Sequence, residues 1–158
     1  VVVNELPQVI AQHRNFVIVG SGKTGMDAVL FLLTHRVDPE RITWIMPRDS
    51  WYLNRRNIQP GKEFLDNTLG GQVRGLEAVT KARSIAELFD TLNDQGQLLR
   101  LSDKHRPTMY RCATVTETEL DALRQIENVV RMGRVSAIGA DEIVLEEGSI
   151  PTNTNTSS

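Results

Sequence analysis

Disulfides, membrane-spanning runs and a strong net charge are all missing from this 158-residue sequence. The single cysteine, Cys112, cannot form an internal disulfide and is typical of a reducing compartment. No apolar run approaches the roughly 20 residues that cross a bilayer, and no segment has the pattern of a signal peptide. We therefore expect a cytoplasmic protein without a membrane partner.

The sequence also has little excess of either charge, since its formal net charge is −2. This balance provides no bulk electrostatic attraction for nucleic acid, so we expect no nucleic-acid partner. With 40% hydrophobic and 24% charged residues, the composition is that of a globular protein, and the length suits one domain.

Three common catalytic or metal-binding patterns are absent as well. The three histidines share no metal-ligand spacing, and Cys112 has no C-x-x-C partner. The Tyr-x-x-x-Lys pair of short-chain dehydrogenases is missing, because Arg56 follows Tyr52 by four residues and Thr114 follows Tyr110. We therefore assign no catalytic residue and no metal site.

The most informative pattern that is present is G-x-G-x-x-G. Apolar residues 16–19 precede it, and apolar residues at helical spacing follow from 25 to about 35. A dinucleotide-binding βαβ unit has this order, because its glycines allow a tight turn, close approach of a pyrophosphate and close packing of the helix. The pyrophosphate then lies at the positive end of that helix. The predicted turn residues are Gly20, Ser21, Gly22, Lys23, Thr24 and Gly25.

The same segment also resembles the end of a nucleoside-triphosphate P-loop, G-x-x-x-x-G-K-[ST]. A P-loop would need a glycine five positions before Gly22, where this chain has Val17 within the predicted strand. The P-loop interpretation therefore fails, and the dinucleotide interpretation stays.

The whole pattern predicts an α/β fold with a Rossmann-like parallel sheet. Residues 1–15 are expected to form an extended lead-in. Residues 16–19 and 41–46 are the first two strands, joined by the helix that follows the glycines. The nucleotide-binding domain as a whole is predicted over residues 16–150.

A long helical insertion is expected after the second strand. A polar loop over 48–61 leads into the insertion at about 62–127, which contains two capping boxes and is expected to pack over the carboxyl edge of the sheet. A third strand begins at 129–130, and a small antiparallel meander follows over 134–150. Residues 151–158 are predicted to form a disordered polar tail.

The residue after the second strand distinguishes NAD from NADP. In NAD proteins a carboxylate about 20 positions past the glycines binds the ribose 2′-hydroxyl, whereas an arginine accommodates a 2′-phosphate. Here Arg48 follows the strand, and Arg55 and Arg56 lie in the same predicted loop, which favours NADP(H). Asp49 is the alternative, as an acceptor for a 2′-hydroxyl. Two aromatic residues are candidates to flank the adenine, Trp51 and Tyr52.

The run FVIVGSGKTGMDAVLFLL…ITWIMPRDSWYLNRRNIQPG resembles the NADPH-binding domain of flavin-containing monooxygenases and related two-dinucleotide-fold oxidoreductases. Its glycines match that family's G-x-G-x-[SA]-[GA] motif, Thr24 takes the serine or alanine place, and Arg48 matches the basic residue after the second strand. The strongest match covers residues 16–61, and a weaker one continues to about 150.

The resemblance implies a domain that holds NADPH for hydride transfer to FAD. This chain has one glycine motif, no F-x-G-x-x-x-H motif, and nothing that resembles the FAD half. FAD is therefore implied only for a larger parent oxidoreductase, whose FAD-binding domain would be the partner, and the fragment alone is expected to be inactive. The alternative is a stand-alone, non-catalytic dinucleotide-binding or protein-interaction module. An incomplete sheet with an exposed edge also favours a homodimer.

Overall fold

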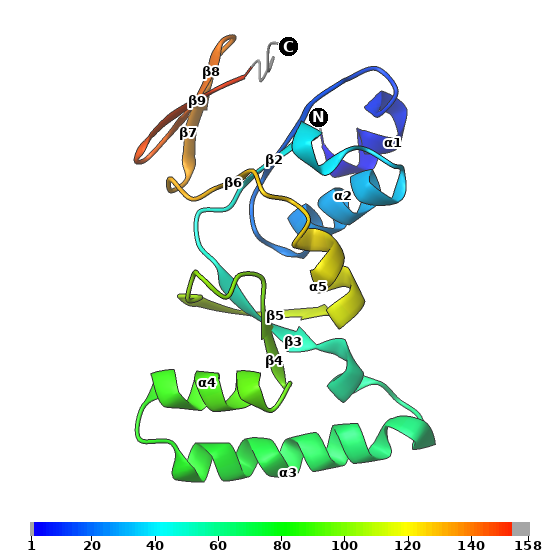
Figure 1. Cartoon of the computed structure of the whole chain (residues 1–158), viewed down its shortest axis with the longest axis vertical. Coiled ribbons are helices and arrows are strands. Elements are labelled where there is room, and N and C mark those ends of the chain that lie inside the picture. The colour runs from blue at the N-terminus through cyan, green and yellow to red at the C-terminus, as the bar shows by residue number, and fades with distance from the viewer. Residues whose placement is uncertain (1, 153–158) are drawn as a thin grey trace. The chain divides into compact units, whose positions relative to one another are not determined.

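The computed structural model describes residues 2–152, and the chain divides into two compact units. One comprises the chain up to Arg48 together with the part from Ala122 onward, and we call it the glycine-turn unit. The other comprises Asp49–Asp121, and we call it the inserted unit. Figure 1 locates the elements of each unit along the chain. Of the tail predicted at 151–158, residues 153–158 lie outside the described residues.

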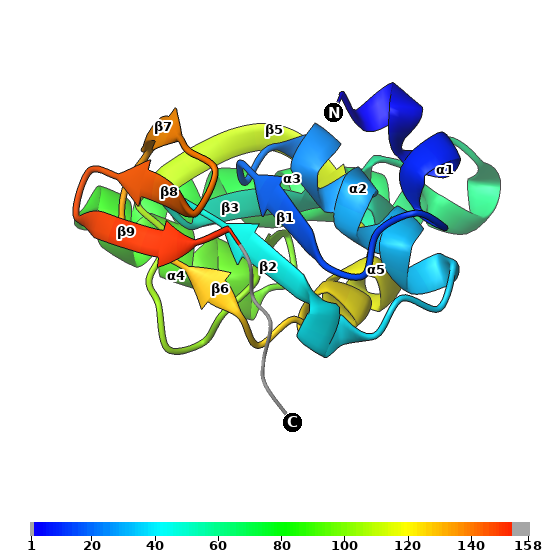
Figure 2. The ribbon, with the colours of Figure 1, turned by 90° about the horizontal axis from the view of Figure 1, so that it is seen from above.

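The glycine-turn unit contains a parallel three-stranded sheet, as the sequence predicts. Strands β1 (Phe16–Val19), β2 (Ile42–Ile45) and β6 (Val129–Val130) lie in the order β1-β2-β6. Both pairings are parallel, and the three arrows run side by side in Figure 2. All four residues of β2 are buried, which explains its uninterrupted apolar and β-branched sequence.

Helix α2 (Lys23–Thr34) joins β1 to β2 and confirms the helix predicted after the glycines. It buries one face, formed by Gly25, Met26, Ala28, Val29 and Leu32. The helix ends where Arg36 adopts a left-handed conformation (φ 61°) and the Val37 N–H donates to the Leu32 carbonyl oxygen at 3.1 Å. The short 3₁₀ turn η2 (Pro39–Arg41) then leads into β2.

The lead-in predicted as extended is helical, so that prediction was wrong. It forms the 3₁₀ turn η1 (Val3–Glu5) and helix α1 (Leu6–Val9). Pro7 stands in the first turn of α1, where its missing N–H costs no hydrogen bond, and Leu6 is buried. One buried apolar side chain is too weak a periodic signal to reveal so short a helix.

The predicted antiparallel meander is confirmed. Strands β7 (Val135–Ile138), β8 (Glu142–Leu145) and β9 (Gly148–Pro151) lie in that order, with both pairings antiparallel. Ile143 and Leu145 of β8 share a buried cluster with Ile45 of β2, so the meander packs on the parallel sheet. Because Pro151 ends β9, this strand extends into the segment predicted as a tail.

The inserted unit contains a second sheet that the sequence analysis did not predict. Strands β3 (Ser50–Asn54), β4 (Leu98–Arg100) and β5 (Met109–Val115) lie in the order β4-β3-β5. Strand β3 pairs antiparallel with β4 and parallel with β5. The loop predicted at 48–61 is therefore partly a strand, and the insertion predicted as helical is mixed. Strand β3 pairs only with segments far along the chain, which local pattern cannot reveal.

The helical part of the insertion follows the predicted start signals. It comprises the 3₁₀ turns η3 (Arg55–Ile58) and η4 (Lys62–Phe64) and the helices α3 (Leu65–Lys81), α4 (Ile85–Asp94) and α5 (Glu117–Leu123). Both predicted N-caps form: Ser84 Oγ accepts from the Glu87 N–H at 3.1 Å, and Thr116 Oγ1 accepts from the Glu119 N–H at 3.1 Å. The reciprocal bond of a capping box is present at Thr116, whose N–H donates to Glu119 Oε2 at 2.7 Å, whereas Glu87 Oε2 accepts from the Arg83 N–H at 2.9 Å. Within residues 2–152, no helix is both long and apolar enough to cross a membrane.

Candidate functional site

The predicted glycine turn lies between β1 and α2, and hydrogen bonds to β2 hold its first residue. Gly20 has φ 108°, a conformation that L side chains rarely adopt. Its N–H donates to the Ile45 carbonyl oxygen at 2.8 Å, and its carbonyl oxygen accepts from Trp44 Nε1 at 2.8 Å. The buried indole of Trp44 therefore orients the peptide that opens the turn.

Gly25 is required for a different reason, which is space. A Cβ built on Gly25 would overlap the carbonyl oxygen of Gly20 and also approach Ile18 Cγ2 at 3.8 Å. Any other residue would push α2 away from the end of β1, so the glycine permits the close packing of helix on strand. By contrast, a Cβ on Gly20 would meet no atom within 4 Å, and the constraint there is conformational.

The first turn of α2 presents backbone N–H groups beside these glycines. Gly22 is the N-cap, with an extended conformation, and it has no side chain with which to cap the helix. The N–H groups of Lys23, Thr24 and Gly25 precede the first intrahelical hydrogen bond, from Met26 N–H to the Gly22 carbonyl oxygen. The turn thus offers donors and the positive end of a helix dipole to an anionic group.

The polar side chains of the turn differ in their contacts. Ser21 is buried, and its Oγ donates to the Arg48 carbonyl oxygen at 3.0 Å. Lys23 forms an ion pair with Asp27 one helical turn later, whereas Thr24 is exposed. Among the residues with predicted roles, Ser21 therefore has the clearest structural one, because it fastens the segment after β2 to the turn.

Of the three predicted arginines, Arg48 lies beside the glycine turn, and its backbone makes the contact. The Ser21 bond holds the Arg48 carbonyl beside the turn, and its side chain is exposed. Arg55 and Arg56 belong to the inserted unit. There Arg55 Nη2 lies 3.4 Å from the Thr114 carbonyl oxygen and 3.6 Å from a Glu119 carboxylate oxygen, so it stabilises that unit.

The other residues considered as nucleotide contacts are buried in the inserted unit. Asp49 is buried, and its carbonyl oxygen accepts from the Thr108 N–H at 3.2 Å. Tyr52 is fully buried, and this burial, with a smaller contribution from the Asp49 charge, raises the pKa of its phenol to about 12. A ring with no exposed surface cannot stack on an adenine, so Tyr52 is a core residue.

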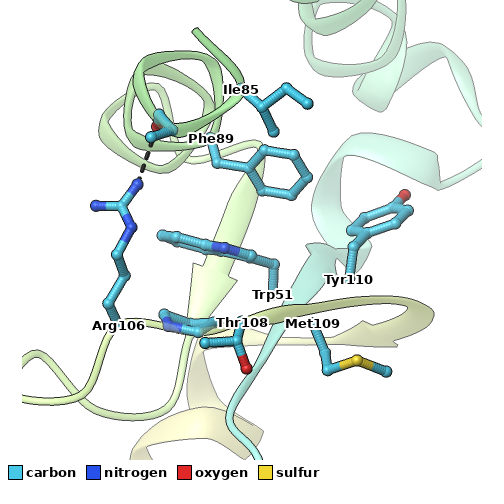
Figure 3. Close-up of a pocket in the computed structure, with 9 residues that line it drawn as sticks. Trp51, Ile85, Phe89, Arg106, Thr108, Met109 and Tyr110 are labelled. Carbon is cyan, nitrogen blue, oxygen red and sulfur yellow. Dashed lines mark hydrogen bonds between the residues drawn. The ribbon is translucent and has the colours of Figure 1, made fainter.

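Trp51 lines a cleft that the sequence analysis did not find (Figure 3). The cleft has a volume of about 350 Å³ and lies within the inserted unit. Phe89 of α4 stands 5.8 Å from the Trp51 ring and 5.9 Å from the Tyr110 ring, centroid to centroid. Because β3, α4 and β5 each contribute one ring, no local sequence motif marks this cleft.

The single charged residue among those that line the cleft is paired. Arg106 Nη1 lies 2.8 Å from an Asp90 carboxylate oxygen, and Nη2 donates to the Ala86 carbonyl oxygen at 3.0 Å. The guanidinium carbon lies 6.0 Å from the centre of the Trp51 ring. Asp90 offsets the guanidinium charge, so the cleft is mainly apolar and offers no net charge to an anion.

Comparison with known proteins finds relatives whose names state no activity. The chain is 49% identical over 148 residues to "Uncharacterized protein Rv2000" of Mycobacterium tuberculosis and to "Uncharacterized protein Mb2023" of Mycobacterium bovis. Each match covers 94% of this chain and 27% of the relative, so the chain spans about a quarter of the length of these curated relatives. No protein-family model and no solved structure matches the chain.

Proposed function

We propose that the glycine-turn unit is a Rossmann-like domain that binds NADP(H) at residues 20–25. The observation that carries this proposal is the close approach of Gly25 to the Gly20 carbonyl, combined with the positive φ of Gly20. A dinucleotide turn depends on both features, since the chain must reverse sharply and the helix must start against the strand. The N–H groups of Lys23 and Thr24 would then donate to the pyrophosphate.

NADP(H) is favoured over NAD(H) by the residue that follows β2. Arg48 is exposed, and its backbone is held beside the turn by Ser21. A guanidinium at this place pairs with a 2′-phosphate through its forked donors. Asp49, the rival for a ribose 2′-hydroxyl, is buried in the inserted unit. Arg55 and Arg56 remain predictions.

The parent activity that we propose is a flavin-dependent oxidoreductase of the monooxygenase type. This chain would contribute the nucleotide-binding part, and the reduced nicotinamide would supply a hydride to an FAD held outside residues 1–158. The support is the resemblance of residues 16–61 to such NADPH-binding domains, together with relatives that are much longer than this chain.

The direct test is calorimetric titration of the purified chain with NADPH and, separately, NADH. We expect NADPH to bind more tightly than NADH. Equal affinity for the two would overturn the role of Arg48, and failure of both to bind would overturn the site.

The variant Arg48→Ala tests the 2′-phosphate contact by itself. We expect it to weaken NADPH binding by about 1–3 kcal/mol, the range for a charge-assisted contact, while NADH binding stays unchanged. Arg14→Ala is the matched control, because Arg14 is also exposed but precedes β1, at the strand end away from the turn. Equal loss of NADPH and NADH binding in Arg48→Ala would indicate a general structural effect instead.

A second candidate function is a non-catalytic nucleotide-binding or interaction module. It is favoured by the exposed apolar side chains on α3, such as Leu69 and Leu76. The visible absorbance of the longer parent protein distinguishes the two, since a bound flavin there would exclude the non-catalytic module.

A further inference from the structure

Helix α3 is amphipathic in the reverse of the usual sense, because its large apolar residues are exposed. They follow one another at intervals of three or four residues and so form one stripe along the helix. Their exposed fractions run from 52% to 69%. We call these residues the α3 stripe: Leu65, Leu69, Val73, Leu76 and Val79.

The opposite face of α3 explains why the stripe points outward. The buried residues of the helix are Gly71 and Ala78. A Cβ on Gly71 would come within 4.0 Å of Asn57 Cβ, and a Cβ on Gly75 would lie 3.1 Å from Gln97 Oε1. The packed face thus carries small residues, and with the large apolar residues on the other side of the helix the stripe is left uncovered.

The α3 stripe is as large as the apolar patches that mark interaction sites. The five side chains expose on the order of 500 Å² of apolar area, comparable to the largest patches of typical monomers, which often mark interaction sites. Two copies that meet through this stripe would bury about 1,000 Å² in total, which is the lower bound for a specific interface.

The charges along the helix are complementary to those of a second copy. Asp66 stands in its first turn and Lys81 in its last turn. Glu63 precedes the helix, Arg83 follows it, and Glu77 lies 3.4 Å from Lys81 within the same chain. The acidic start and basic end make the helix complementary to a second copy that runs in the opposite direction, and antiparallel helix dipoles add to this attraction.

We propose that the α3 stripe is a homodimer interface, in which α3 of one copy packs antiparallel against α3 of a second. A two-fold axis near Val73 places Leu69 of one copy against Leu76 of the other. It also brings the acidic start of each helix level with the basic end of the other along the helix axis. This surface differs from the exposed sheet edge that the sequence suggests for a homodimer, and it does not depend on nucleotide binding.

Sedimentation velocity of the whole chain over a micromolar concentration series tests the stripe. We expect a concentration-dependent dimer, and at least a tenfold increase in its dissociation constant in Leu76→Glu. Ile138→Glu is the matched control, because Ile138 on β7 has the same exposed fraction as Leu76, 69%. A chain that stays monomeric throughout, or a dimer that Leu76→Glu leaves intact, overturns the proposal.

Charge reversal and cross-linking test the antiparallel direction. Lys81→Glu should weaken the dimer, and the double variant Asp66→Lys with Lys81→Glu should restore it. In a Cys112→Ser background, Leu69→Cys mixed with Leu76→Cys should give mixed disulfides, because these two positions face each other in the proposed dimer. Preferential Leu69→Cys self-cross-linking would indicate parallel helices and contradict the proposal.

Discussion

The two units differ in how far apart their paired strands lie in the sequence and in where their apolar side chains point. In the glycine-turn unit, β1 and β2 are separated only by α2 and its following turn, and that helix buries its apolar face. In the inserted unit, β3 pairs with strands that follow two further helices, and α3 exposes its large apolar residues. The sequence reveals which side chains are buried when burial follows a local pattern. It does not reveal them when burial depends on strands that pair from distant parts of the chain.

The largest difference between the units is expected from substituting one glycine in each. Gly25→Ala should destabilise the chain by about 3 kcal/mol and abolish nucleotide binding, because the new Cβ overlaps a backbone oxygen that cannot rotate away. Gly70→Ala in α3 meets only the flexible end of Arg74, at 3.1 Å, and should be neutral or stabilising by up to about 1 kcal/mol.

Urea unfolding measures both stabilities, with hydrogen exchange to assign the loss to one unit. Equal stability of the two alanine variants, or normal NADPH binding by Gly25→Ala, would contradict the expected difference between the units.

A buried amide tests whether the inserted unit has a specific core of its own. Asn54 Nδ2 donates to the Gly96 carbonyl oxygen at 3.0 Å and to Glu117 Oε1 at 3.1 Å. Its Oδ1 accepts from the Arg56 N–H at 3.1 Å. Asn54→Ala removes all three hydrogen bonds and leaves the Arg56 N–H and Glu117 Oε1 without this partner, which should cost about 2 kcal/mol.

Asn57→Ala serves as the matched control for this amide. Asn57 is half-buried and donates to the same Gly96 carbonyl oxygen at 2.9 Å, so its removal should cost about 1 kcal/mol or less. We expect faster hydrogen exchange in β3 and η3 for Asn54→Ala. Equal losses in the two variants would mean that burial of Asn54 adds nothing.

The smallest expected effect comes from Tyr52, whose pKa is raised from 10.0 to about 12 mainly by burial. The folded state therefore keeps its proton while the unfolded state loses it, so the contribution to stability is complete below pH 10 and falls as the pH rises from 10 to 12. The loss between pH 10 and pH 11 should be about 1 kcal/mol.

Urea unfolding at several pH values, compared between the wild type and Tyr52→Phe, isolates this contribution from other titrating groups. The variant should lose stability less steeply above pH 10. Tyr110→Phe should change the profile less: burial and the neighbouring Cys112 also raise the pKa of the Tyr110 phenol, but this residue is 46% exposed. Parallel pH profiles for the wild type and Tyr52→Phe would show that the Tyr52 phenol is not buried in solution.

Much of the glycine-turn unit could be predicted because each of its signals is local. The apolar run at β1, the glycine spacing and the helical period of α2 each occupy a few adjacent residues. The helix start signals at Ser84 and Thr116 are equally compact, and both side chains cap their helices. The third strand and the meander followed from alternation and turn residues.

The inserted unit was harder because its decisive contacts are distant in sequence. Strand β3 stands among polar residues and reads as a loop until β4 and β5 supply its partners. The cleft brings together Trp51, Phe89 and Tyr110 from three different elements. Tyr52, a candidate for the adenine from its position alone, is fully buried instead.

By itself the sequence determined the glycine turn, since the need for a positive φ at Gly20 and for space at Gly25 appears directly as missing side chains. The tertiary structure alone decided which side of α3 faces outward. The helical period reveals an apolar stripe but not its direction, and only the small residues of the packed face, Gly71 and Ala78, leave the large ones exposed. A backbone constraint is local, whereas the direction of burial depends on what the rest of the chain brings alongside.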